Sequence, residues 1–562
     1  MSIHCRIILA SAFLVTGSAH AAPAADVVTF QSFRQETTAT FADADKREGV
    51  ARLTNLNANV NGWYVLAVKW PGAARETIYN LERPDSKSYD LAISNRGLTV
   101  TVNGKQTACD LFLDSSLLRG ANRDAYVPLC EGKVLVRNQA HGTSGDAMSW
   151  GAGLLRDTLG STGNDIVAAV KDLREDSGLV QAQTSTSDEK PFPVGDRPSR
   201  AIVSKSAQKT ALTVPDLQIE LEGAGRSLLS GAWYKAKNNA GVFFSAMQPS
   251  FVEESILNSY RDRANALDSV EASALSYMVA FDLSQFELGW AHGTKLPGVA
   301  WSPQQPASRR GSSLSGPDGF DSLNPLVLTG KINPTFLPRL AAVMCGGFQR
   351  MHSVFGSGVL GNSNNGSYYG FIENGVVLSH LNPGLATAIS YTDGRFDIKT
   401  WTEKDNESLS KIRYARQNGV PLVESDAQGN AVPGALVKRW GDGNWSGNVA
   451  GKKRSQRAGA CISEQNGKRY LIYGYFSSAN PDAMAQVFRS YNCQYAIHLD
   501  MNSAGQGYIG LLSRSGGKVF TENPVREMSA RNTTMKADGK SITTPRYVGR
   551  SDEADFFYFL RK

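Results

Sequence analysis

Long apolar runs, closely spaced cysteines and basic stripes interleaved with aromatic residues are all scarce in this sequence of 562 residues. Beyond residue 21 no apolar stretch approaches the roughly 20 residues that a membrane-spanning helix needs, so we expect no integral membrane segment. No two of the six cysteines have CxxC spacing, and beyond residue 21 no histidine falls beside a cysteine, which leaves a structural zinc site without support. The missing basic stripes argue against nucleic acid as a partner.

The first 21 residues have the pattern of a secretory signal peptide. Arg6 supplies a basic start, residues 7–15 form a short apolar run, and Ala19-His-Ala21 is a small-x-small cleavage pattern. No cysteine closes the run in the manner of a lipoprotein anchor. We therefore expect residues 1–21 to be removed and the mature protein to be periplasmic or secreted.

Five cysteines remain after that removal, and pairing is their default in an oxidising compartment. We expect Cys109 to pair with Cys130 and Cys461 with Cys493, which leaves Cys345 free and buried. The sequence alone does not fix this connectivity.

The net charge of the chain is modestly positive. It falls from +7 to +6 when Arg6 leaves with the signal peptide. An excess of this size is typical of a solvated basic surface, and it is also compatible with a small anionic substrate. The sequence does not predict an oligomeric state.

A chain of this length is expected to form more than one domain. Residues 26–180 contain short strand patterns, such as 62–70 and 98–105, and predict a separate β-rich N-terminal domain of unassigned role. Residues 181–200 are polar and proline-containing and predict a linker. Residues 201–562 then form the second domain.

The second domain contains patterns of both strands and helices. Hairpins are predicted around the Asn-Gly turn in 369–378 and around Asp393-Gly394, and a helix is expected over 250–266. A capped amphipathic helix after Asn480 lies between two apolar strands, which indicates a crossover unit. These patterns predict an α+β fold with a mixed, largely antiparallel sheet and flanking helices.

The strand predicted over 493–501 runs into a polar turn that contains glycine. Regular alternation would place His498, Asp500 and Asn502 on one face, opposite Ile497 and Leu499. An imidazole, a carboxylate and an amide would then line one groove. The alternative is a buried strand whose polar side chains bond to neighbouring backbone.

Three segments of the C-terminal half occur in a characteristic order. They are Cys345-Gly-Gly-Phe348, Gln456-Arg-Ala-Gly-Ala460 and the stretch from Ala483 to Asp500. In this order they resemble the phosphodiester glycosidase family, whose segments read Asn-Gly-Gly-Phe, Arg-[Thr/Ser]-Ala-[hydrophobic]-Gly and a helix and strand leading to Asn-Leu-Asp-Gly-Gly. The resemblance covers roughly residues 276–512 and leaves the N-terminal domain unexplained.

The chain resembles a divergent member of that family. Cys345 and His498 each stand where the family has asparagine, and Met501-Asn502 stands where it has Gly-Gly. The resemblance implies a site around Asp500 and Arg457. The residues expected to bind substrate are Gly346, Gly347, Phe348, Asn502, Arg416 and Asn418.

The chemistry of these side chains agrees with the resemblance. Asp500 is the candidate acid, base or nucleophile for breaking a glycosidic bond. Arg457 has the fork that suits phosphate, and His498 can donate to the leaving group or tune the carboxylate.

The function expected from the resemblance is that of an exported hydrolase. It would cleave a sugar-1-phosphodiester or related linkage in cell-envelope or extracellular glycans, with a carbohydrate or sugar phosphate as its substrate and with no cofactor or metal. Because Cys345, His498 and Met501-Asn502 differ from the family's residues, the alternative is a non-catalytic envelope protein that keeps the family's fold and binds polysaccharide. A third possibility is metal-dependent chemistry, with His498, Asp500 and Asn502 as ligands.

Overall fold

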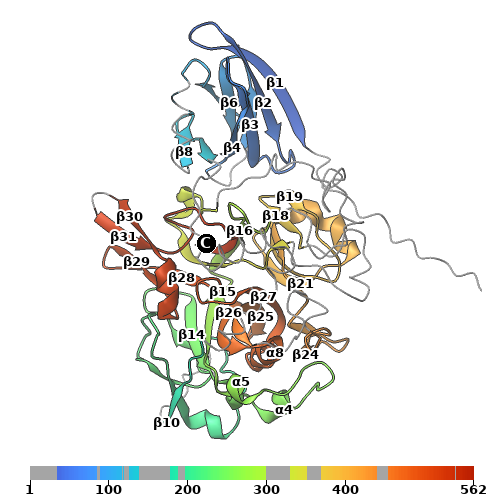
Figure 1. Cartoon of the computed structure of the whole chain (residues 1–562), viewed down its shortest axis with the longest axis vertical. Coiled ribbons are helices and arrows are strands. Elements are labelled where there is room, and N and C mark those ends of the chain that lie inside the picture. Colours follow the sequence, from blue (N-terminus) through green and yellow to red (C-terminus); the bar gives the residue numbers. More distant parts are fainter. Residues whose placement is uncertain are drawn as a thin grey trace, which may run out of the picture.

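The protein is an elongated assembly of β-sheets, with its N-terminal sheets at one end of the long axis (Figure 1). The computed structural model describes residues 34–84, 89–114, 116, 118, 126–137, 178–187, 197–298, 330–350, 369–439, 454–537 and 540–562. The expected signal peptide lies outside the described residues. None of the described helices is long and apolar enough to span a bilayer.

The expectation of an α+β fold with flanking helices is wrong, because the described chain is mostly strand and its strands pair antiparallel. Its described α-helices are α4 (Glu254–Leu257), α5 (Ser269–Ser273) and α8 (Pro481–Ser490). The helix expected over 250–266 is wrong: only α4 lies in that range, and Tyr260 has a left-handed φ of 53°, which an α-helix does not contain. The described 3-10 helices are η1 (Ser206–Lys209), η2 (Pro249–Phe251), η4 (Pro334–Phe336), η6 (Glu403–Lys411) and η7 (Arg526–Arg531).

Two sheets form the N-terminal part. The six-stranded sheet has the order β1 (Gln35–Ala42), β2 (Glu48–Asn55), β3 (Trp63–Lys69), β4 (Thr77–Glu82), β9 (Val134–Arg137) and β8 (Tyr126–Leu129). The three-stranded sheet has the order β5 (Tyr89–Ile93), β6 (Gly97–Val102) and β7 (Lys105–Asp110). Leu66 and Leu81 of the first sheet and Val100 of the second share one buried cluster. The predicted disulfide between Cys109 and Cys130 is confirmed, with 5.2 Å between the α-carbons.

The stretch expected as a linker contains a strand. β10 (Gln183–Thr186) pairs with β11 (Thr210–Thr213), which pairs in turn with β12 (Ser227–Leu229). Residues 188–196 lie outside the described residues. The domain boundaries drawn from the sequence stay a prediction.

The sheet that carries the predicted crossover has eight strands. Their order is β13 (Tyr234–Lys235), β14 (Val242–Met247), β15 (Ser276–Asp282), β26 (Lys468–Ala479), β25 (Ser455–Gln465), β27 (Cys493–Met501), β23 (Val423–Ser425) and β24 (Ala431–Pro433). Both β26 and β27 pair antiparallel with β25, so they run in the same direction, and α8 crosses over β25 between them. The Asn480 side chain accepts the Ala483 N–H as the predicted N-cap. The crossover is therefore confirmed.

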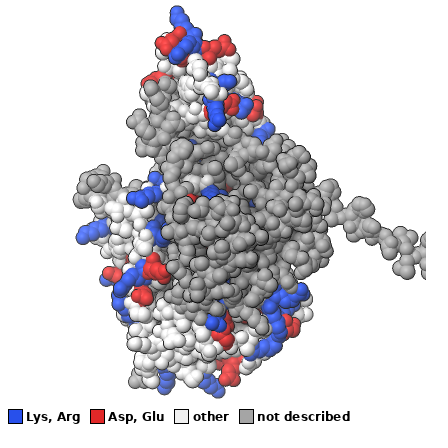
Figure 2. Space-filling model, viewed as in Figure 1, with Lys and Arg blue, Asp and Glu red and all other residues white. Residues whose placement is uncertain are grey.

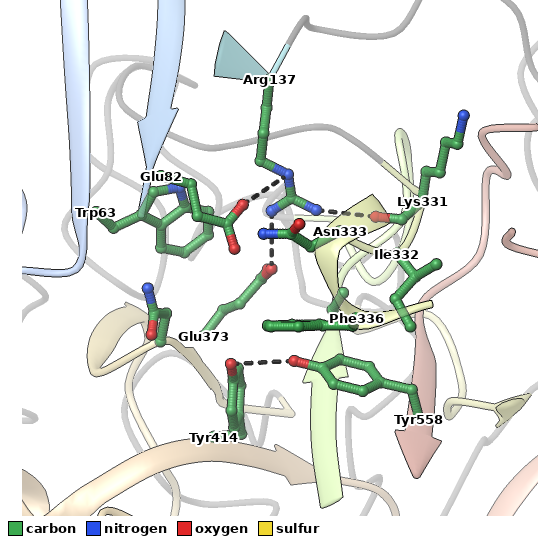
Figure 3. A pocket seen from close by; sticks show the side chains of 12 residues that line it. Trp63, Glu82, Arg137, Lys331, Ile332, Asn333, Phe336, Glu373, Tyr414 and Tyr558 are labelled. Carbon is green, nitrogen blue, oxygen red and sulfur yellow. Dashed lines mark hydrogen bonds and ion pairs between the residues drawn. The ribbon is translucent and has the colours of Figure 1, made fainter. Parts of the chain in front are cut away.

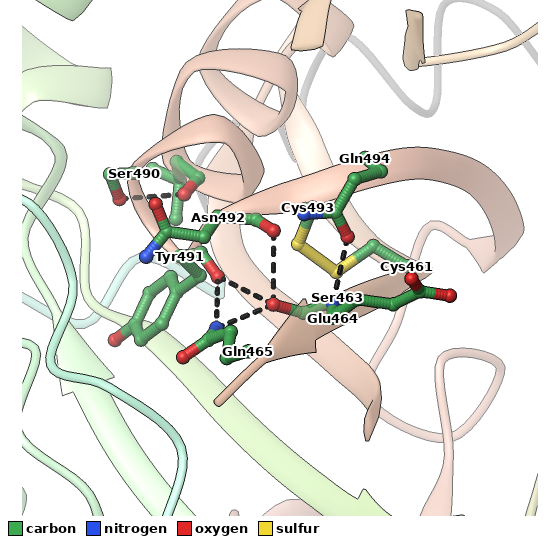
Figure 4. The surroundings of a disulfide bond; sticks show 10 residues. Cys461, Ser463, Glu464, Gln465, Ser490, Tyr491, Asn492, Cys493 and Gln494 are labelled. Atoms are coloured by element: carbon green, nitrogen blue, oxygen red, sulfur yellow. Dashed lines mark hydrogen bonds between the residues drawn. A yellow bond between two sulfur atoms is a disulfide. The ribbon is translucent and has the colours of Figure 1, made fainter. Parts of the chain in front are cut away.

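A disulfide between Cys461 and Cys493 joins β25 to the start of β27 (Figure 4), as predicted. Beside it the Ser463 hydroxyl lies 2.9 Å from the Asn492 carbonyl, which anchors the turn between α8 and β27. Cys345 is free and buried, which also agrees with the prediction. Two disulfides are compatible with a periplasmic or extracellular protein.

Two five-stranded sheets and one hairpin complete the structure. One sheet has the order β16 (Phe286–Ala291), β32 (Phe556–Arg561), β17 (Leu340–Cys345), β28 (Ile509–Ser515) and β29 (Lys518–Glu522). The other has the order β19 (Val376–Ser379), β18 (Phe371–Glu373), β22 (Ile412–Gln417), β20 (Ala386–Tyr391) and β21 (Phe396–Thr400). The hairpin pairs β30 (Thr533–Ala537) with β31 (Lys540–Thr544). Pairing of β18 with β19 and of β20 with β21 confirms both predicted hairpins.

The N-terminal sheets dock on the rest of the chain through a buried polar cluster (Figure 3). Arg137 of β9 is 3% exposed, and its guanidinium lies 3.1 Å from Glu82 of β4 and 3.5 Å from Glu373 of β18. Trp63 belongs to the same apolar cluster as Phe371 and Tyr558 of the C-terminal sheets. The cavity among these side chains is about 10 Å³, room for a single water molecule. It is therefore too small to be a substrate site.

Candidate active site

The strand β17 ends in the loop Gly346-Gly347, which other elements approach closely. The Gly346 carbonyl accepts the backbone N–H of Asp500 at 3.0 Å, which ties the loop to β27. A β-carbon on Gly346 would lie 2.0 Å from Oδ2 of Asp555, and one on Gly347 would lie 2.5 Å from Cγ of Asn418. Glycine is required at both positions because of this close packing.

Asn418 joins the same loop to β27 from the other side. Its Oδ1 accepts the Phe348 N–H at 2.8 Å, and its Nδ2 donates to the His498 carbonyl at 2.8 Å. The side chain is 1% exposed. In this structure the amide fixes the position of the loop.

Arg416 and Asp555 form a fully buried ion pair behind the loop. Arg416 Nε donates to Asp555 Oδ2 at 2.9 Å, and its Nη2 donates to the Phe348 carbonyl at 2.6 Å. Trp290 Nε1 and the Gly347 N–H also donate to Asp555 Oδ2, at 2.9 and 3.3 Å. Sequence analysis did not identify Asp555 or Trp290. The available signal was a carboxylate placed directly before the apolar strand Phe556–Arg561.

Asp500 lies at the end of β27 and is partly exposed. Burial raises the pKa of its carboxyl group to about 7, and the neighbouring Asp555 carboxylate adds to the rise, while the Met501 N–H, Arg546 and Arg416 oppose it. At neutral pH this carboxyl is therefore close to half protonated. Burial also raises the pKa of the adjacent Cys345 thiol, which stays protonated and is not a nucleophile.

A β-bulge interrupts the regular alternation that the sequence predicts in β27. Arg457 of β25 pairs with Met501, and Gly459 pairs with His498, so two steps along β25 correspond to three along β27. A β-carbon on Gly459 would lie 2.9 Å from Cε2 of Phe488 in α8, so side chains at this position point toward α8. His498 therefore lies on the α8 side of the sheet.

Asp500 lies on the opposite side of this sheet from His498. Its carboxyl group interacts with Cys345 and Asp555, which belong to the neighbouring sheet formed by β17 and β32. The prediction that His498 and Asp500 share one face of the strand is therefore wrong. The extra residue of the bulge reverses the alternation, so the two side chains lie on opposite sides of the sheet.

Arg457 accompanies His498 on the α8 side. It is 1% exposed, and its Nε donates to the Ala479 carbonyl at 2.7 Å, while Nη1 lies 3.1 Å from the Met501 sulfur. Burial lowers the pKa of Arg457 to about 10, so it remains charged at neutral pH. Burial and the Arg457 charge both lower the pKa of His498, whose imidazole is neutral. The His498 ring lies 5.9 Å from that of Phe348.

Asn502 adopts a left-handed backbone conformation, with φ of 84°. The family that the sequence resembles has glycine at this position. Asparagine enters this conformation more readily than most other residues with a side chain. Its N–H donates to the Gln456 carbonyl at 2.7 Å.

Neither the distribution of surface charge nor a cluster of metal-binding side chains indicates a second site among the described residues. Acidic and basic side chains are interspersed over the described part of the face shown in Figure 2. Within the described residues, no group of three or more His, Cys, Asp and Glu side chains could hold a metal ion.

Neither a protein-family model nor a curated protein matches this chain. Among solved structures, the catalytic domain of zebrafish N-acetylglucosamine-1-phosphodiester alpha-N-acetylglucosaminidase, auto-inhibited by its pro-peptide, is similar at 10% identity and a TM-score of 0.29, covering 75% of this chain and 96% of that one. A protein from Burkholderia pseudomallei is similar at 11% identity and a TM-score of 0.21, covering 51% and 74%. A hypothetical protein from Synechocystis is similar at 10% identity and a TM-score of 0.23, covering 91% and 95%. TM-scores this low do not establish a shared fold.

Proposed function

We propose that the protein is an exported hydrolase that cleaves a sugar-1-phosphodiester or related glycosidic linkage, with Asp500 as its acid/base or nucleophile. The observation that carries this proposal is the carboxyl group of Asp500, whose pKa is raised to about 7. A group that gives and takes a proton during turnover works best when its pKa is near the operating pH. The three sequence segments that resemble phosphodiester glycosidases supply the substrate class.

This reaction requires a single group that transfers a proton, and it does not require a pair of carboxylates. In a sugar phosphodiester the departing phosphate is a weak base, so it leaves with little protonation, and Asp500 can take a proton from the attacking water. Asp555 accepts hydrogen bonds from Trp290, Arg416 and Gly347. With its oxygens engaged in this way, Asp555 is suited to positioning the loop and not to attacking the sugar.

Arg457, to which the sequence resemblance gives the role of holding phosphate, is buried with His498 on the α8 side of the sheet, and a phosphate bound at Asp500 would lie on the other side. The Arg457 guanidinium bonds to the Ala479 carbonyl and contacts the Met501 sulfur, and the negative charge of Glu271 acts on it.

The test uses the purified full chain and a synthetic glucosyl-1-phosphodiester of a simple alcohol, followed by ³¹P NMR. Cleavage of the glycosidic bond converts the diester signal to an alkyl phosphomonoester and releases free glucose, whereas P–O cleavage to the alcohol would give glucose 1-phosphate. We expect Asp500→Asn to lower the rate at least 100-fold, within the range of general acid/base contributions. Asp397→Asn, a carboxylate on β21 paired with Arg469, is the matched control. Full turnover by Asp500→Asn would remove Asp500 from the mechanism.

The second candidate is a polysaccharide-binding protein without catalysis. It is favoured by the mutual satisfaction of the buried groups, since Asn418, Arg416 and Asp555 all bond to protein atoms. Saturable glycan binding by the C-terminal sheets with an unchanged ³¹P spectrum would support it.

A further inference from the structure

His292, the residue that follows β16, lies between the N-terminal sheets and the candidate active site. The side chain is 3% exposed, and the proposed function does not use it. The centroid of its ring lies 6.5 Å from that of Trp63 in β3 and 6.2 Å from that of Trp290 in β16. The imidazole therefore stands between one aromatic ring of the N-terminal sheets and one of the C-terminal sheets.

Glu373, at the end of β18, holds His292 in this position. Its Oε2 accepts the backbone N–H of His292 at 3.2 Å and contacts Nδ1 of the ring, so one oxygen fixes both the backbone and the imidazole. The other ring nitrogen, Nε2, is buried without a hydrogen-bond partner among the described residues. A buried polar atom without a partner lowers stability. Packing alone therefore does not explain why a histidine occupies this position.

The second oxygen of Glu373 ties this arrangement to the N-terminal sheets. Oε1 lies 3.5 Å from Nη1 of Arg137 in β9, and Nη2 of Arg137 donates to the Lys331 carbonyl at 2.9 Å (Figure 3). The contact between Arg137 and Glu373 exists only while the N-terminal sheets are docked. The group that holds His292 is thus itself held by the docked sheets.

Trp290 connects His292 to the candidate active site. The two rings are stacked, with 29° between their planes. Trp290 Nε1 donates to Asp555 Oδ2 at 2.9 Å, and the same oxygen accepts the Gly347 N–H at 3.3 Å. A rotation of the indole would weaken its bond to Asp555, and the Gly346-Gly347 loop would then lose part of its support.

We propose that His292 is a positioning residue, which couples the docking of the N-terminal sheets to the bond between Trp290 and Asp555. That bond supports the loop beside Asp500. The effect on turnover rests on the proposed function, whereas the coupling itself does not. The inference gives the N-terminal sheets a role, because their docking completes the support of the loop.

The coupling is measured by NMR of the full chain labelled with ¹⁵N-tryptophan, in which the Nε1–H signal of Trp290 is assigned by its loss in Trp290→Phe. A hydrogen bond to a carboxylate shifts such a signal downfield. We expect the signal to move upfield in His292→Leu, and also in Arg137→Met, which breaks the contact with Glu373. Arg52→Met is the matched control, because Arg52 is an exposed arginine of the same sheets that also pairs with two glutamates. In this variant the signal should not move.

The same variants are assayed with the glucosyl-1-phosphodiester. We expect His292→Leu to lower kcat about tenfold or more and to leave KM within a factor of about two, because a misplaced loop affects the chemical step more than binding. Thermal melts establish that each variant is folded. Glu373→Gln keeps an oxygen for His292 but turns an amide toward Arg137, and it replaces either variant that does not fold.

Three results would overturn the inference. The first is an unchanged Trp290 signal in folded His292→Leu. The second is a shift in His292→Leu with none in Arg137→Met, since Trp290 would then not depend on docking. The third is an equal shift in Arg52→Met. If the wild type does not cleave the diester, the proposed function fails, and the NMR comparison still decides the coupling.

Discussion

Oδ2 of Asp555 lies 2.9 Å from Nε of Arg416, and both side chains are almost completely buried. Through this pair the end of β22, the start of β32 and the Gly346-Gly347 loop are held together. Removing one partner of such a pair leaves an uncompensated charge in the interior.

Arg416→Met is accordingly expected to lower the free energy of unfolding by about 3–5 kcal/mol. The loss follows from the stranded Asp555 carboxylate and from the lost bond to the Phe348 carbonyl. Urea titration monitored by circular dichroism measures it. Arg395→Met removes one partner of the exposed pair with Asp393 and should cost less than about 1 kcal/mol. Equal losses in the two variants would contradict the role given to the buried pair.

The contribution of Asp500 to the stability of the protein should fall as the pH rises from about 4 to about 7. Asp500 has a pKa of about 7 in the folded state and an ordinary value near 3.9 when unfolded, so in this range the unfolded chain releases a proton that the folded chain keeps. The decrease is at most about 4 kcal/mol, from three pH units at about 1.4 kcal/mol each, and it is complete above pH 7.

The contribution of Asp500 is isolated by comparison with Asp500→Asn, since burial also raises the pKa of Glu271 to about 7. The variant should gain stability relative to the wild type as the pH rises from 4 to 8. Glu271→Gln is the control and should keep the part of the slope that belongs to Asp500. Parallel pH profiles for the wild type and Asp500→Asn would show that the Asp500 carboxyl is not perturbed.

Gly346→Ala should destabilise the protein by about 1–3 kcal/mol, the usual range for overpacking a buried position. Its new methyl group would meet the Asp555 carboxylate at 2.0 Å, so that carboxylate must shift and the loop with it. We also expect the rate of diester cleavage to fall. Gly225→Ala, where the new methyl group would have no atom within 4 Å, is the control, and both are compared by thermal melting and ³¹P NMR.

Replacing Cys461 and Cys493 together by serine should cost about 3–4 kcal/mol, the loop-closure estimate for a separation of 32 residues. The bridge closes the crossover that contains α8, so hydrogen exchange in residues 481–490 should rise more than in β1 or β2. An exchange pattern that rises evenly over the whole chain would argue against a local role for this bridge.

Local sequence signals predicted local structure correctly. Asn480 and Pro481 marked the start of α8, and the Asn374-Gly375 turn marked the hairpin of β18 and β19. These elements depend on residues a few positions apart, which a single sequence displays directly. The helix expected over 250–266 is interrupted at Tyr260, which has a left-handed φ and whose ring lies 4.9 Å from the Arg489 guanidinium of α8, a contact that the local pattern does not display.

The arrangement of the side chains in the candidate site could not be predicted from such local signals. The bulge in β27 is a property of its pairing with β25, so the pattern of β27 alone gave no sign that His498 and Asp500 separate. Asp555 reaches Gly347 and Arg416 from a distant part of the sequence. Contacts of that kind are set by how strands meet, and no spacing rule describes them.

The position of β32 has a consequence for the timing of folding. Phe556–Arg561 fills the place between β16 and β17, two strands that the ribosome makes far earlier. Until those residues emerge, β16 and β17 have no strand between them, and the edges that they will pair with β32 stay open. Such a chain cannot settle into its final form until its last residues have been made.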